Sequence, residues 1–172
     1  MSLNIVLHEP EIPQNTGNIA RTCAATGAAL HLIEPLGFSI DEKAVRRAGL
    51  DYWSKLSLFV YANLDDFFHQ NSVGPYFFCT TKARKTYAET SYPSGAYLIF
   101  GKESKGIPED ILVKHPDDCI RIPMKPDIRS LNLSNAVAIV TYEALKQRGF
   151  RSMDLEGELH DQSWDDGQDE SP

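Results

Sequence analysis

The 172-residue sequence contains few cysteines and no long apolar run. Its three cysteines, Cys23, Cys79 and Cys119, are odd in number and without paired spacing, which favours reduced thiols in a cytoplasmic protein over a disulfide framework. No apolar stretch approaches the roughly 20 residues that span a bilayer, and the first residues lack the basic region of a signal peptide. The five histidines are scattered, so no metal site is expected.

Three common motifs of α/β proteins are also missing. The first apolar run, Leu3 to His8, is not followed by the G-x-G-x-x-G fingerprint of dinucleotide-binding proteins. Gly101–Gly106 has the glycine spacing of a P-loop, but Ile107 and Pro108 follow where Lys and Ser or Thr are required. No G-x-S-x-G nucleophile motif occurs. These absences disfavour a nicotinamide oxidoreductase, a P-loop enzyme and an α/β-hydrolase.

The net charge of -7 arises in the C-terminal 22 residues. Of 24 acidic and 17 basic residues, eight acids and one base lie in residues 151–172, which leaves 16 of each in residues 1–150. Because the tail also loses hydrophobic periodicity, we expect a folded domain over 1–150 and an acidic, disordered tail over 151–172. A neutral domain can hold a local basic patch for phosphates or merely a solvated charged face, and both interpretations stay open for two clusters. These are Lys43, Arg46 and Arg47, and Arg84 with Lys85.

Strand-like and helix-like segments alternate along residues 1–150. Strands are expected at Leu3–His8, Leu30–Ile33, Leu56–Tyr61, Tyr76–Thr80, Tyr97–Phe100 and Ile120–Ile122. Helices are expected at Gln14–Thr26, 39–48, 64–70, Pro108–His115 and Ser134–Arg148. This alternation predicts an α/β fold with a parallel sheet and helices on both faces, in which ligands bind at the carboxyl ends of the strands.

The first polar segment, Asn15–Arg21, opens the first expected helix. Asn18 and Arg21 are three residues apart and therefore share a helix face. An amide beside a guanidinium suits a phosphate or a ribose. A capped helix with a surface arginine is the alternative.

The second polar segment, Leu98–Pro108, follows a buried strand. Gly101 ends that strand and permits close approach of the backbone to a ligand. Glu103 places a carboxylate in the loop after the strand, where functional residues concentrate. An ordinary turn with surface charges is the alternative.

The third polar segment, Ile122–Asn135, is a proline-stiffened loop that leads into the strongest helix signal. It brings many hydrogen-bond donors to one place: Arg129, Ser130, Asn132, Ser134 and Asn135. Either Asn132 or Ser134 can cap the helix, and capping needs only one of them. The others are candidates for ligand contact.

These three segments resemble, in order and in spacing, the three motifs of the SPOUT RNA methyltransferases. The stretches NTGNIAR, LIFGKESKGIP and IPMKPDIRSLNLSNAVAIVTYEAL carry the resemblance, which extends from Leu3 to Phe150. The similarity is greatest to the small, single-domain TrmL/YibK-type tRNA 2′-O-methyltransferases. It implies a single-domain parallel-sheet α/β/α fold with a C-terminal trefoil knot, which is an exception to the usual unknotted topologies. It also implies a homodimer whose active site is completed across the interface.

The resemblance implies an enzyme that methylates the ribose 2′-OH of nucleotide 34, C or a modified U, in the anticodon region of tRNA. S-adenosylmethionine would be the methyl donor, bound in a bent shape by Cys79, Thr80, Gly101, Ile122, Met124, Ser130 and Leu131. Five residues fall on motif positions that the family ties to catalysis: Asn15, Arg21, Glu103, Ser130 and Asn132. Alternatives are an rRNA 2′-O-methyltransferase and a catalytically inactive RNA-binding protein of the same fold.

The resemblance, together with the chemistry of these side chains, suggests a role for each catalytic candidate. The resemblance implies that Arg21 acts as a base through a phosphate. A guanidinium keeps its proton at neutral pH and is a poor base, however, so the expected role of Arg21 is to hold the phosphate and stabilise developing alkoxide charge. Asn132 and Ser130 are expected to orient the ribose and the cofactor carboxylate. Glu103 is expected to fix the neighbouring loops.

Overall fold

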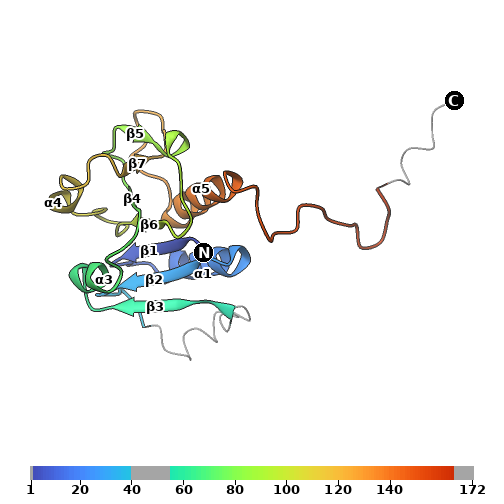
Figure 1. Cartoon of the computed structure of the whole chain (residues 1–172), viewed down its shortest axis with the longest axis horizontal. Coiled ribbons are helices and arrows are strands. Elements are labelled where there is room, and N and C mark those ends of the chain that lie inside the picture. The colour runs from blue at the N-terminus through green and yellow to red at the C-terminus, as the bar shows by residue number, and fades with distance from the viewer. Residues whose placement is uncertain (1, 40–54, 165–172) are drawn as a thin grey trace.

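A computed structural model describes residues 2–39 and 55–164 of the chain (Figure 1). The strands are β1 (Asn4–His8), β2 (Ala29–Ile33), β3 (Leu58–Tyr61), β4 (Tyr76–Cys79), β5 (Lys85–Thr86), β6 (Tyr97–Phe100) and β7 (Cys119–Arg121). The helices are α1 (Pro13–Thr26), α3 (Leu64–Gln70), α4 (Glu109–Leu112) and α5 (Leu133–Lys146), with a short 3₁₀ turn, η2 (Tyr87–Glu89).

The seven strands form one sheet in the order β3-β2-β1-β6-β4-β7-β5, and every neighbouring pair is parallel. The predicted parallel α/β sheet is therefore confirmed. Because the strands are parallel, the carboxyl ends of β4, β6 and β7 lie at the same edge of the sheet. The loops that follow these three neighbouring strands are thereby brought together, although they are separated along the chain.

Each face of the sheet is covered by helices, as the sequence predicted. Side chains of β1 alternate between the two faces, with Ile5 on one and Val6 on the other. The Ile5 face packs against α1 and α5 through residues such as Ile19 and Val140. The opposite face packs against α3 and α4, where Phe67 is completely buried. Among the described residues, no helix is both long enough and apolar enough to cross a membrane.

Helix ends follow local signals closely. Gly27 ends α1 in the left-handed region at φ 68°, as expected for a residue after a helix terminus, and its N–H donates to the carbonyl of Cys23. Asn63 caps α3 by accepting a hydrogen bond from the N–H of Asp66. Of the two candidates for capping α5, the structure uses Asn132.

The expected helix from Pro108 to His115 is wrong in its length. Pro108 is the N-cap residue, and α4 ends at Leu112. After Leu112 the backbone makes tighter i→i−3 bonds, including one from the His115 N–H to the Leu112 carbonyl, so the α-helical pattern does not continue. The sequence also missed β5 and η2, since a two-residue strand leaves no periodic signal. The expected helix at 39–48 and the cluster Lys43, Arg46 and Arg47 lie outside the described residues, apart from Ser39.

Residues 151–164 form no helix or strand and extend away from the folded part of the chain (Figure 1). Met153 packs against the core, but residues 154–164 are exposed. Trp164 is 68% exposed, and its indole N–H donates to the Gly157 carbonyl within the same segment. The domain boundary at residue 150 and the trefoil knot both stay predictions.

Candidate active site

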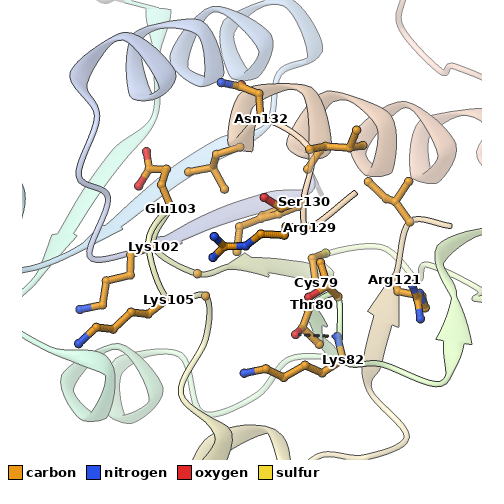
Figure 2. Close-up of a pocket in the computed structure, with 18 of the residues that line it drawn as sticks. Cys79, Thr80, Lys82, Lys102, Glu103, Lys105, Arg121, Arg129, Ser130 and Asn132 are labelled. Carbon is orange, nitrogen blue, oxygen red and sulfur yellow. Dashed lines mark hydrogen bonds between the residues drawn. The ribbon is translucent and has the colours of Figure 1, made fainter. Parts of the chain in front are cut away.

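A pocket of about 540 Å³ opens where the loops after β4, β6 and β7 meet the first turns of α1 and α5 (Figure 2). This volume is in the range of sites that bind small organic ligands. Its floor is apolar and includes Phe100, Ile120 and Val140. The pocket is therefore suited to a ligand with one apolar part and several polar groups.

Cationic side chains surround this pocket. They are Lys82, Lys102, Lys105, Arg121 and Arg129. Within the described part of the chain, Glu103 is the only acidic residue that lines it. A concave surface with this excess of positive charge attracts anions such as RNA phosphates. Residues 2–39 and 55–164 contain no group of three side chains placed to hold a metal ion.

Gly101 is required by the close packing of its own loop. A Cβ at this position would lie 2.1 Å from the backbone nitrogen of Ile107 and 2.2 Å from the carbonyl carbon of Gly106. The loop turns back at this point, since the N–H of Gly106 donates to the carbonyl of Lys102 over 2.8 Å. Gly101 lines the pocket as expected, but the approach that demands a glycine is made by the chain itself.

Glu103 joins the loop after β6 to the start of α1. Its Oε2 accepts a hydrogen bond from the Glu11 N–H over 2.9 Å. Its Oε1 accepts from the Ile12 N–H over 3.3 Å and from the Asn15 side chain over 3.0 Å. The Oδ1 of Asn15 accepts in turn from the Asn132 amide over 3.0 Å. One residue from each of the three sequence motifs thus belongs to a single polar network.

Asn132 has a structural role in addition to its place in this network. Its Oδ1 caps α5 by accepting from the Ser134 N–H over 2.9 Å and from the Ser134 hydroxyl over 2.7 Å. Its amide nitrogen donates to Asn15. Hydrogen bonds therefore fix both the oxygen and the nitrogen of the Asn132 amide. Asn132 lies at the edge of the pocket and is labelled in Figure 2.

Sequence reasoning missed Glu11, which mirrors Glu103. The Glu11 carboxylate accepts from the Ser104 N–H over 2.9 Å and from the Ser104 hydroxyl over 2.8 Å. These bonds lower the pKa of Glu11 below its usual value. Glu103, in the loop after β6, thus bonds to the segment before α1, and Glu11, in that segment, bonds back to the loop after β6. We call this reciprocal pair of connections the clasp. An ion pair between Lys102 and Glu9 adds a third link. The only signal in the sequence was an acid shortly after the first strand, which does not identify its partner.

Cys79 and Thr80 enter the pocket from the end of β4. Burial, with a contribution from the neighbouring Cys119, raises the pKa of Cys79 well above its usual range. The thiol is therefore neutral and contributes an apolar surface to the lining of the pocket. The Thr80 hydroxyl accepts from the Lys82 N–H, the bond that is dashed in Figure 2.

The pocket gathers ten of the eleven residues that the resemblance ties to catalysis or cofactor binding: Asn15, Cys79, Thr80, Gly101, Glu103, Ile122, Met124, Ser130, Leu131 and Asn132. Arg21 does not line it. Arg21 lies on the exposed side of α1, six residues after Asn15, which corresponds to about 9 Å along the helix and a different face. The pocket is therefore formed without Arg21.

A model of the SpoU rRNA methylase family matches residues 2–142. The chain belongs to this family. The chain is 50% identical over 149 residues to a relative from Escherichia coli K12, which is named tRNA (cytidine(34)-2′-O)-methyltransferase. The match spans 86% of this chain and 95% of that protein. A solved structure concerned with the 2-OH methylation of C/U34 on tRNA superposes with a TM-score of 0.81 at 42% identity, over 87% of this chain and 98% of that one.

An AdoMet-bound rRNA methyltransferase from Sinorhizobium meliloti shares the SpoU-family fold with a TM-score of 0.72 at 25% identity. The match covers 84% of this chain and 56% of that longer one. The predicted SPOUT-type α/β fold and methyltransferase class are confirmed by these similarities.

Proposed function

We propose that this SpoU-family protein transfers a methyl group from S-adenosylmethionine to the ribose 2′-OH of nucleotide 34, C or a modified U, in the anticodon region of tRNA. The observation that carries this proposal is the network that joins Asn15, Glu103 and Asn132 at the rim of the pocket. The named activity of the E. coli relative, which is similar over nearly its whole length, supports the choice of RNA. A tRNA substrate would place the protein in the cytoplasm.

The pocket fits S-adenosylmethionine. Apolar side chains such as Ile122 and Leu131 suit its adenine ring, while the hydroxyls of Thr80 and Ser130 suit its polar groups. When bound, the cofactor supplies an electrophilic methyl group on sulfur. Titration calorimetry with S-adenosylhomocysteine should detect binding to the purified protein, and a titration without heat or a change in Tm would contradict this assignment.

The residues of the network position the ribose. A ribose hydroxyl is a poor nucleophile, so its orientation and the acceptance of its proton must supply much of the rate enhancement. The amide nitrogens of Asn15 and Asn132 each carry a second hydrogen beyond the one used in the network, and these can hold ribose oxygens. The Glu103 carboxylate already accepts three hydrogen bonds, so we assign it to positioning.

We infer that the working form is a homodimer, because the pocket lacks Arg21 from its own subunit. Large apolar side chains are exposed on or beside α1 and α5, which pack side by side: Ile12, Ile128, Leu131, Ile139 and Tyr142. An exposed apolar surface of this kind is typical of an interface. A twofold arrangement through it would bring Arg21 of the partner subunit to each pocket, where a guanidinium can hold phosphate and stabilise alkoxide charge.

Complementation between inactive variants tests the shared site. Arg21→Ala and Asn132→Ala should each be nearly inactive, but an equal mixture of refolded or co-expressed chains should recover about a quarter of the activity, since half of the dimers contain one intact site. The matched control mixes Asn132→Ala with Glu103→Ala. Both changes affect the same subunit's pocket, so no recovery is expected. Absence of recovery in the first mixture would contradict the shared site.

The substrate is tested by mass spectrometry. Incubation of the protein and S-adenosylmethionine with tRNA from a strain that lacks the gene should add one methyl group to the ribose of nucleotide 34. Methylation of rRNA alone, or of no RNA by a protein that binds the cofactor, would overturn the proposed substrate and favour the two alternatives respectively.

A further inference from the structure

A second cavity, of about 640 Å³, adjoins the candidate active site. It lies between the loop that follows β4 and the segment that contains and follows α4. The two cavities share Thr80 and Lys82 in their linings, so a chain molecule bound in one can continue into the other. In Figure 2, Lys82 extends from the side of the active site opposite to Asn132.

The second cavity combines cations with an apolar surface. Arg84 and Lys85 line it and are exposed, and neither forms an ion pair within the described part of the chain. Lys82 is already paired with Glu109, with a nitrogen to oxygen distance of 2.7 Å. The apolar part comes from Leu112, Val113 and Pro116, and Val113 is 72% exposed.

This combination fits a nucleotide. Exposed guanidinium and ammonium groups bind phosphate oxygens, while an aliphatic surface can cover the face of an unstacked base. Sequence-specific RNA proteins commonly bind single-stranded loops whose bases are splayed out in this way. Glu109 and Asp117, which also line the cavity, disfavour a ligand with a high density of negative charge, such as a free polyphosphate.

We propose that the second cavity is a flanking-nucleotide site: it binds a nucleotide adjacent to the methylated one, with its phosphate on Arg84 and Lys85 and its base against Val113. This inference rests on the proposed function, because it requires a single-stranded RNA segment at the neighbouring active site. The site contributes RNA affinity and directs the strand, whereas the methyl donor is bound elsewhere.

The test uses the full-length double variant Arg84→Ala/Lys85→Ala. We expect its KM for tRNA to rise about tenfold, because two charge-assisted phosphate contacts are lost. The slope of log Kd against log salt concentration should fall by about 0.7 for each phosphate contact that is lost. Affinity for S-adenosylhomocysteine should stay within about twofold of the wild-type value, since neither residue lines the candidate cofactor pocket.

A control variant with the same change of charge is Lys55→Ala/Arg151→Ala, whose two residues are exposed and line neither cavity. Its KM and salt slope should match those of the wild type. Val113→Asp supplies a second test of the same site. It replaces the apolar surface for the base with a carboxylate, whose negative charge repels the neighbouring RNA phosphate. This variant should therefore raise KM without altering cofactor affinity.

The position of the phosphate is tested with anticodon stem-loop RNAs that carry one uncharged methylphosphonate linkage. When the linkage next to nucleotide 34 that contacts Arg84 and Lys85 is neutral, wild type and double variant should bind equally. If the double variant retains the wild-type KM and salt slope, or if its defect persists with a neutral linkage on either side of nucleotide 34, the flanking-nucleotide site is wrong. Failure of the wild-type protein to methylate nucleotide 34 would instead overturn the proposed function.

Discussion

Replacing Glu103 with alanine removes the acceptor of three hydrogen bonds at the rim of the pocket. A hydrogen bond to a charged group contributes roughly 1.5 to 3 kcal/mol where it is buried. Glu103 is only half-buried, so water replaces part of each bond, and we take about 1 kcal/mol for each of the three. Asn15 is 5% exposed, so water compensates its amide less easily. The clasp between the two loops should therefore weaken by about 3 kcal/mol.

This local loss predicts a larger effect on kcat than on cofactor binding. If the free energy is expressed in the transition state, about 3 kcal/mol corresponds to roughly a 100-fold lower rate, and partial relaxation of Asn15 makes a 10- to 100-fold reduction the expected range. Glu103→Gln keeps one carbonyl oxygen for Asn15 but presents an amide N–H to the Glu11 N–H. It should lose about 3- to 10-fold.

Single-turnover transfer of a labelled methyl group to tRNA measures the effect, with Kd for S-adenosylhomocysteine and Tm recorded in parallel. Glu158→Gln is the matched control, because this carboxylate is exposed and does not line the pocket. It should leave all three quantities unchanged. A Glu103→Ala protein with a rate within about threefold of wild type would refute the positioning role of the clasp.

Three further outcomes are expected. Gly101→Ala should lower affinity for S-adenosylhomocysteine at least tenfold and lower Tm, because the new Cβ would lie 2.1 Å from the Ile107 nitrogen. Burial lowers the pKa of His31 from 6.5 to about 4, so the unfolded chain binds an additional proton between these values. Stability that is present above pH 6.5 is therefore lost as pH falls towards 4, by about 3 kcal/mol at most, and urea unfolding of His31→Gln should show a smaller pH dependence. Removal of residues 156–172 should leave Tm unchanged, because residues 156–164 are exposed; a drop of several degrees in thermal unfolding would contradict this.

Much of the candidate site could be predicted because its parts are local. The left-handed Gly27 after α1 and the cap before α5 depend on backbone geometry within a few residues. Gly27 was placed correctly, and the cap was narrowed to Asn132 or Ser134, of which the structure uses Asn132. The length of α4 could not be predicted in the same way. Whether the chain after Leu112 continues as an α-helix or tightens depends on packing against the sheet, and intrinsic preference is too weak to decide it.

Partners that are distant in sequence were not predictable from spacing. Glu103 and Asn15 are 88 residues apart, and Asn132 and Asn15 are 117 apart. A parallel sheet places β1 beside β6 and β6 beside β4, and this order is set by the burial of whole strands rather than by any local motif. The reciprocal role of Glu11 follows from that order, as does the sharing of Thr80 and Lys82 by two cavities.

By itself, the sequence determined the alternation of strands and helices, the helix caps and the polar residues at the three strand ends, since each depends on short-range periodicity, backbone preference and side-chain chemistry. Only the tertiary structure decided which of those residues meet, that Gly101 is crowded by its own loop, and that Arg21 lies outside the pocket of its own chain. The physical reason is that contacts across a parallel sheet depend on strand order and helix packing, which involve the whole chain at once.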